Sequence, residues 1–182
     1  MGSGLKQAMT TIRLATPADV PALARLAETT FVQAFVEGHA IAYPPDDLAA
    51  FLTASYAPEK VAGWIADPRG HVIVAEDAQG ALIGYAQSGD NELPYGDAKP
   101  GDGELKRLYV RREHQGDGVG RALLERSLAW LGDRMILIGV WSENYGAQRL
   151  YARYGFEKVG EYHFMVGLFA DAEFILRRGL AA

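Results

Sequence analysis

The spacing of apolar residues in the first third of the chain predicts one short strand followed by helices. Residues 11–14 alternate between polar and apolar, as a strand does. Thr16 can cap a helix whose apolar residues recur at helical spacing as far as about residue 37. Two further helices are expected between Pro44 and Pro68, because proline favours the first turn of a helix and cannot continue one.

Strand patterns follow these helices. Residues 71–77 and 81–89 are rich in apolar residues and flank the turn residues 78–80, which predicts a hairpin. The stretch 90–103 holds two prolines and three glycines, which predicts a loop. Residues 103–111 are expected to form the next strand, so this part of the chain predicts a meander of antiparallel strands.

The last third predicts two helices around a buried strand, and then two more strands. Residues 119–131 have the apolar spacing of an amphipathic helix. Residues 135–141 are β-formers of a buried strand, and a helix from residue 147 ends at Gly155. The tail, residues 157–178, reads as two strands joined by a glycine turn.

This order of elements predicts an α/β fold of the α+β type: a mixed, mostly antiparallel central sheet with helices on both faces. The strand–helix–strand unit over residues 104–141 requires one parallel pair, between the fourth and fifth strands. No repeat, linker or low-complexity tract appears, so residues 11–182 are expected to form a single domain. The polar start, residues 1–10, is interpreted as a tag or a disordered segment.

Composition narrows the function classes. No stretch approaches the roughly 18 uncharged apolar residues of a membrane span, and the polar start is no signal peptide. Cysteine is absent, which excludes disulfides, thiolate metal sites and cysteine nucleophiles, and a cytoplasmic enzyme is the default expectation. The four histidines have no metal-ligand spacing, so no metal is expected. A net charge of −5 without a basic stripe disfavours nucleic acid and favours a cationic partner.

Three glycines, at positions 116, 118 and 120, crowd the junction between the strand at 103–111 and the following helix. Such a junction directs unpaired backbone N–H groups at a ligand and binds phosphate without charged side chains. The dinucleotide-binding fingerprint requires glycine or alanine at the position of Arg121, so it does not match. The Walker loop does not match either, because the stretch has no lysine. A pyrophosphate site and a merely flexible turn are the two interpretations left open.

The glycine stretch and a later segment together resemble the GNAT superfamily of N-acetyltransferases. The pattern Gln/Arg-x-x-Gly-x-Gly/Ala, typical of that family's acetyl-CoA pyrophosphate loop, is met by Gln115, Gly116, Asp117, Gly118, Val119 and Gly120. The family's second signature is similar to the positions occupied by Asn144, Ala147, Tyr151, Gly155 and Phe156. The resemblance implies a GNAT-like sheet, acetyl-CoA as cosubstrate, and a cofactor site that also includes Arg121 and the strand residues Leu108, Tyr109 and Val110.

The strand that precedes the glycines carries the expected acetyl-transfer chemistry. Strict alternation places Leu105 and Tyr109 on one face and Leu108 and Val110 on the other, and this break in phase predicts a β-bulge that frees backbone amides. The resemblance implies that these amides receive the pantetheine arm and the thioester carbonyl. Glu104 is the candidate base, acting through water, and a solvated strand-end carboxylate is the alternative.

Tyr151 is the candidate general acid, because it matches the family tyrosine that lies near the CoA sulfur. A neutral phenol can donate to a thiolate, whose conjugate acid has a pKa near about 8.5. The alternative is a core aromatic. Asn144 can cap the following helix, contact the pantetheine, or do both.

The acceptor is expected to be a small primary amine. Residues 138–167 look most like the bacterial spermidine/spermine N-acetyltransferases, which implies a polyamine, and Phe31, Tyr43 and His163 are the candidate acceptor-binding residues. Protein N-termini or lysines are the second class of acceptor, and a non-catalytic acetyl-CoA-binding module is the rival class of function. The apolar tail strands also suggest a homodimer.

Overall fold

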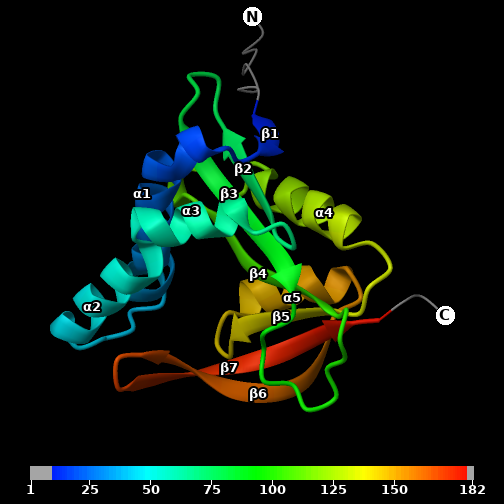
Figure 1. Ribbon diagram of the computed structural model, residues 1–182. Helices are drawn as coiled ribbons and strands as arrows, with labels where there is room; N and C mark the ends of the chain where they lie inside the picture. Colours follow the sequence, from blue (N-terminus) through cyan, green and yellow to red (C-terminus); the bar gives the residue numbers. More distant parts are fainter. Residues whose placement is uncertain (1–9, 180–182) are drawn as a thin grey trace, which may run out of the picture.

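The computed structural model describes residues 10–179. The predicted tag or disordered start therefore lies, apart from Thr10, outside the described residues. The fold is built around one seven-stranded sheet (Figure 1) with the strand order β1-β2-β3-β4-β5-β7-β6. The strands are β1 (Thr11–Leu14), β2 (His71–Glu76), β3 (Leu82–Asp90), β4 (Gly103–Val110), β5 (Ile136–Trp141), β6 (Glu157–Val166) and β7 (Phe169–Arg178).

All neighbouring strands pair antiparallel except β4 and β5, which are parallel. The predicted mixed sheet with one parallel pair is thus confirmed. The helices are α1 (Val20–Phe31), α2 (Pro45–Tyr56), α3 (Pro58–Ala66), α4 (Val119–Leu131) and α5 (Tyr145–Arg153). Figure 1 shows α1 and α3 on one side of the sheet and α4 on the other, as predicted.

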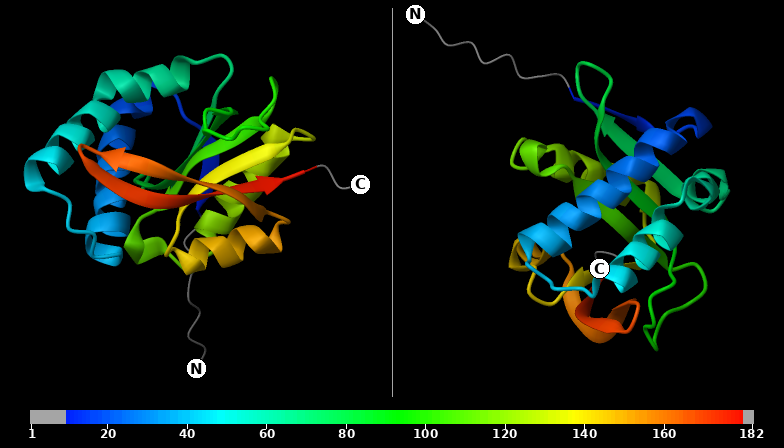
Figure 2. Two further views of the ribbon diagram at one scale, coloured as in Figure 1. Left: turned by 90° about the horizontal axis from the view of Figure 1, so that it is seen from below. Right: turned by 90° about the vertical axis from the view of Figure 1, so that its left-hand side faces the viewer.

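Two apolar cores hold these layers together. One lies between the sheet and α1–α3 and centres on Leu23, Leu26 and Phe31. The other lies between the sheet and α4–α5 and centres on Leu123 and Leu124. The β6–β7 hairpin reaches out beside α2 (Figure 2), where the Leu168 N–H donates to the Asp47 carboxylate at 3.3 Å.

The first helix differs from its prediction at its end. The α-helix stops at Phe31, and the chain continues as a π-helix over Val32–Gly38. A π-helical turn inserts an extra residue per turn and shifts the faces on which side chains lie, which apolar spacing alone does not reveal. The α5 helix begins two residues before the predicted start, because Asn144 caps it.

The predicted bulge in β4 is present. Gln87 pairs with Arg107 and Ser88 pairs with Leu105, so Lys106 has no partner in β3. The extra residue reverses the phase of the strand, and Leu105 therefore packs with Leu108 in the core beneath α4, while Tyr109 packs with the α1 core. Strict alternation would place Leu105 with Tyr109, and the bulge is the reason that this alternation does not hold, as the break in phase predicted.

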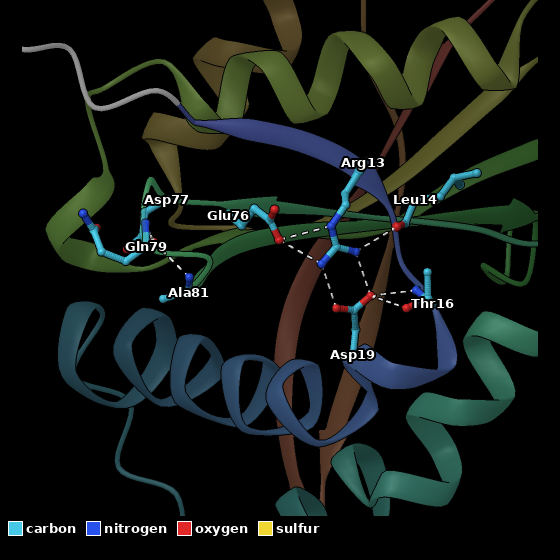
Figure 3. A network of polar contacts seen from close by, with 8 residues as sticks. All are labelled: Arg13, Leu14, Thr16, Asp19, Glu76, Asp77, Gln79 and Ala81. Atoms are coloured by element: carbon cyan, nitrogen blue, oxygen red, sulfur yellow. Dashed lines mark hydrogen bonds and ion pairs between the residues drawn. The ribbon is translucent and has the colours of Figure 1, made fainter.

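An ion-pair network ties β1 to the start of α1 and to β2 (Figure 3). The Arg13 guanidinium donates to both carboxylate oxygens of Asp19 at 2.8 Å and to Glu76 at 2.8 Å. Asp19 also accepts from the Thr16 backbone N–H at 2.7 Å. These contacts, the Arg13 hydrogen bonds first, hold the pKa of the Asp19 carboxyl well below its ordinary value.

Replacing Asp19 by asparagine is expected to lower the free energy of unfolding by about 1–2 kcal/mol, because the charge-assisted bonds to Arg13 are lost while Arg13 stays partly hydrated. The deficit shrinks as the pH falls below about 4, since a carboxyl with a depressed pKa stabilises the fold only while it is ionised. Urea unfolding of the wild type and the variant measures this loss in the free energy of unfolding. The matched control is Glu161→Gln in the exposed Lys158–Glu161 pair, and equal effects of the two changes would contradict the prediction.

Candidate active site

The cleft at the centre of the molecule exists because β4 and β5 separate. The two strands pair only at Gly103 with Ile136 and at Glu104 with Leu137. Beyond these positions they diverge around a cleft of about 180 Å³. Its walls include residues of both predicted signatures together with the strands and the first helix, namely Gln115, α5 with its cap (Asn144, Ala147, Tyr151), β4 (Leu105, Lys106, Arg107, Leu108, Tyr109, Val110), β5 (Ile138–Trp141), Glu173 of β7, and Thr30, Ala34 and Phe35 at the end of α1 and in the π-helix.

Two backbone amides of β4 face this cleft. The Arg111 N–H donates to the Ile83 carbonyl of β3 at 2.9 Å. Amides in an antiparallel strand alternate in direction, so the Tyr109 N–H also faces β3, and the amides of Leu108 and Val110 face the gap that β5 has left. The Val110 carbonyl on the same side accepts from the Gln115 side-chain amide at 3.1 Å. Sequence reasoning grouped all three amides together, and the geometry separates Tyr109 from the other two.

The glycine loop lies at the N-terminus of α4, next to the cleft. Gly116 and Gly118 have φ values of +90° and +84°, a conformation that favours glycine, and no atom lies within 4 Å of a Cβ built at either position. Gly118 is the N-cap of α4. The first amides of that helix have no carbonyl partner within it and carry the positive end of the helix dipole. Residues 115–118 of the loop are exposed, so these amides are accessible to an anion such as a pyrophosphate.

Tyr151 and Asn144 lie on the opposite wall. The Asn144 side chain accepts from the Ala147 N–H at 3.1 Å, so it caps α5 and also lines the cleft. Tyr151 is buried, and its ring packs edge-on against Phe156. Burial raises the pKa of the Tyr151 phenol to about 12, which keeps the hydroxyl protonated at neutral pH.

A second cavity, of about 260 Å³, adjoins the cleft on the side of α1. Six residues line both spaces, namely Phe35, Lys106, Arg107, Tyr109, Gly139 and Glu173. The second cavity also contains aromatic side chains and further carboxylates, including Phe31, Phe35, Tyr56, Glu92, Glu104, Tyr162 and Phe164. Leu93 and Pro94 of the 90–103 loop contribute to its wall, so the loop that had no assigned role covers this cavity.

Of the three predicted acceptor residues, the structure brings only Phe31 to this cavity. Tyr43 lies in the α1 core, where its hydroxyl donates to the Asp171 carboxylate, and it lines neither space. His163 is exposed, because strand alternation turns it to the face opposite Tyr162 and Phe164. Tyr43 and His163 are therefore corrected to positions outside the cavity.

Glu104 lines the second cavity but not the cleft. Its carboxylate accepts from the Glu92 N–H at 2.7 Å and lies 3.8 Å from the Lys106 ammonium. Burial raises the pKa of the Glu104 carboxyl above its ordinary value, and these two contacts oppose the rise. The interpretation of Glu104 as a solvated strand-end group is wrong, since the residue is buried.

Sequence reasoning missed Glu173 of β7, which is buried and borders both spaces. Burial raises the pKa of the Glu173 carboxyl to about 7. A signal was present, because Asp171 and Glu173 share the strand phase of the core residue Ile175, which directs two carboxylates inward from an apolar strand.

Two further observations concern metal sites and membrane spans. Over residues 10–179, no group of three or more histidine, aspartate or glutamate side chains could hold a metal ion. Within the same range, no helix is both long and apolar enough to cross a membrane. The candidate site thus combines an amide-lined cleft, a glycine-rich loop at the N-terminus of α4, a protonated phenol and two buried carboxyl groups.

Comparisons with known proteins identify the family and the fold. The acetyltransferase (GNAT) family profile matches residues 32–156. An uncharacterised N-acetyltransferase of Mycobacterium tuberculosis strain H37Rv is 31% identical over 165 residues, covering 89% of this chain and 98% of that protein. The crystal structure of PaiA N-acetyltransferase from Thermoplasma acidophilum, in complex with coenzyme A, has the same fold. Its TM-score is 0.72 at 18% identity, covering 94% of this chain and 99% of that one.

The similarity to polyamine acetyltransferases is narrower than expected. The spermine/spermidine N(1)-acetyltransferase of Bacillus subtilis strain 168 is 31% identical over 90 residues, which cover 47% of this chain and 59% of that protein. The match to the family profile and the extended similarity to the mycobacterial protein are broader. The chain belongs to the acetyltransferase (GNAT) family and is an N-acetyltransferase that uses acetyl-CoA as its cosubstrate.

Proposed function

We propose that the enzyme transfers the acetyl group of acetyl-CoA directly to a primary amine of a small cationic molecule, with polyamines as the first candidates. The observation that carries this proposal is the second cavity, where Glu92, Glu104 and Glu173 surround a space of about 260 Å³ next to the cleft. Carboxylates attract an ammonium group, and the net charge of −5 assists its approach. The partial similarity to the Bacillus enzyme supports the same class of acceptor.

The cationic side chains of this cavity are already engaged. Arg107 donates to the Gln87 side chain at 2.7 Å and lies over the Trp64 ring, 4.5 Å from its centre. Lys106 lies 2.7 Å from the Glu92 carboxylate. Lys106 and Glu92 offset one another's charge, and Arg107 keeps its charge but is held by neutral groups, so Glu104 and Glu173 are the carboxylates available to a ligand ammonium.

Each wall of the cleft has a place in the proposed reaction. The glycine loop and the first amides of α4 hold the pyrophosphate of acetyl-CoA. The amides of Leu108 and Val110 receive the pantetheine arm and stabilise the oxyanion that forms when the amine attacks. Tyr151, protonated at neutral pH, donates to the departing thiolate.

Two other functions remain as alternatives. A protein N-terminus or lysine could supply the amine, and a non-catalytic module could bind acetyl-CoA only to sense it. The buried Tyr151 and the buried carboxylates favour an enzyme, because burying ionisable groups costs free energy that a sensor does not need to spend. A cytoplasmic location and a homodimer stay predictions.

Thiol release from acetyl-CoA, measured against spermidine, spermine, diamines, aminoglycosides, amino acids and short peptides, tests the acceptor class. We expect turnover with spermidine or spermine. Across the panel, we expect kcat/KM to be highest for the small cationic amines. Turnover with peptides alone would move the assignment to protein acetylation. Binding of acetyl-CoA without turnover on any amine would favour the sensor.

Replacing Tyr151 by phenylalanine is expected to lower kcat about 100-fold while leaving acetyl-CoA affinity within a factor of about two, because only proton donation to the thiolate is lost. The matched control is Tyr154→Phe on the same helix, whose exposed hydroxyl donates to Glu125. Steady-state kinetics and calorimetric titration measure the two effects. An unchanged kcat in the Tyr151 variant would remove this residue from the mechanism.

Replacing Gly118 by alanine is expected to weaken acetyl-CoA binding about tenfold, because alanine resists the positive φ that the loop needs in order to converge its amides. Gly80→Ala is the control, since Gly80 has a φ of +80°, similar open surroundings and a position in the β2–β3 turn. Both variants should lose similar stability in urea unfolding. Equal acetyl-CoA affinities, measured by calorimetry, would contradict the pyrophosphate role.

A further inference from the structure

Glu173 lies where the two cavities meet. In the sheet it pairs with Tyr162 of β6 and with Trp141 of β5, so these three side chains share one face. Only 7% of the residue is exposed. The second cavity, which would hold the acceptor, is called the acceptor cavity below. Among the carboxylates that line it in the described part of the chain, Glu173 alone also lines the cleft. An amine in the one cavity and a thioester in the other would meet beside this side chain.

Tyr162 and Gly139 determine where the Glu173 carboxylate lies. The Tyr162 hydroxyl donates to it across the β6–β7 pair. Gly139 of β5 lies beneath this pair, and a Cβ built there would stand 2.5 Å from the Tyr162 hydroxyl and 3.0 Å from Glu173 Oε2. A larger residue at position 139 would therefore displace the Tyr162 hydroxyl and crowd the carboxylate to which it donates, so this close approach favours glycine.

The Glu104 carboxylate makes contacts of a different kind. One of its oxygens accepts from the Glu92 N–H, which fastens the start of the 90–103 loop over the acceptor cavity. Lys106 binds Glu92 from the same side at 2.7 Å. These contacts suit a residue that positions the loop, and they direct Glu104 away from the cleft in which the thioester would lie.

We propose that Glu173 is the catalytic base that takes the proton from the acceptor ammonium, and that Glu104 is a positioning residue for the loop. This inference rests on the proposed function. The Glu173 carboxylate accepts one proton, and the neutral amine then forms the C–N bond with the thioester carbon. The C–S bond breaks with its electron pair on sulfur, which takes the Tyr151 proton. As the amide forms, the nitrogen loses its second proton to the Tyr151 phenolate, which becomes a phenol again. Glu173 then releases its proton to solvent.

The electrostatic setting supports this role. Burial raises the pKa of Glu173 to about 7, the Tyr162 hydrogen bond opposes the rise, and the nearby Asp171 charge adds to it. A base with a pKa near the working pH combines sufficient ionisation with sufficient affinity for a proton. The titratable and charged groups around it are Glu104, Lys106, Arg107 and Tyr109 of β4, Tyr162 of β6, Asp171 of β7 and Glu92 of the loop.

The test measures kcat/KM against pH for the wild type and for Glu173→Gln, with two acceptors. Spermidine must lose a proton before it attacks, whereas 2,2,2-trifluoroethylamine is uncharged at neutral pH. With spermidine we expect an about 100-fold loss near neutral pH in the variant, together with loss of the wild-type inflection near pH 7. With trifluoroethylamine the loss should be less than about tenfold, whereas a merely structural defect would lower both rates alike.

Two neighbouring variants move the inflection in opposite directions. Tyr162→Phe removes a hydrogen bond that favours the carboxylate, so the inflection moves to higher pH. Asp171→Asn removes a like charge, so it moves to lower pH while turnover is retained. Calorimetric titration with acetyl-CoA shows that each variant still folds and binds.

The outcomes separate the inference from the proposed function. A wild-type inflection that survives in Glu173→Gln but disappears in Glu104→Gln would overturn the assignment of the base and leave the acetyltransferase intact. Equal losses of Glu173→Gln on both acceptors would also overturn it. Absence of turnover by the wild type with every amine, despite acetyl-CoA binding, would overturn the proposed function and this inference with it.

Discussion

The divergence of β4 from β5 is the constraint on which the rest of the site depends. Two paired positions join these strands, and beyond them the amides of β4 on that side have no strand to pair with. Unpaired backbone groups in an interior cost free energy unless water or a ligand satisfies them. The pantetheine arm and the thioester carbonyl offer suitable hydrogen-bonding groups, and the proposed cosubstrate site uses the open sheet for this reason.

The bulge at Lys106 makes this opening compatible with a packed core. It reverses the phase of β4, so that Leu105 and Leu108 both reach the core beneath α4, while Arg107 and Tyr109 face the acceptor cavity. β7 pairs with β5 on the side away from β4, and this pairing brings Glu173 to the edge of the cleft. One irregular strand and one antiparallel neighbour thus bring the cleft and the second cavity together, as the proposed transfer between them requires.

Local patterns in the sequence were sufficient for most of the fold. The bounds of α4, the β2–β3 hairpin, the parallel pair and the bulge could all be read from spacing, glycines and proline. The π-helix after Phe31 could not, because the apolar spacing through Phe35 fits a continued α-helix equally well. The acceptor cavity was largely missed, since it joins α1, the 90–103 loop, β4, β6 and β7, which are far apart in the sequence. Tyr43 and His163 were misplaced for that reason, and Glu173 was overlooked.

A crystal structure of the protein with bound acetyl-CoA tests the central claim most directly, because it shows which backbone groups the thioester contacts. The account predicts that the pyrophosphate lies on the amides of residues 116–121 and that the thioester oxygen accepts from the Leu108 or Val110 N–H between the separated strands. The acetyl carbon would then face Glu173, with sulfur beside Tyr151. A cosubstrate bound outside the cleft, or β4 and β5 closed into a continuous ladder, would contradict the account.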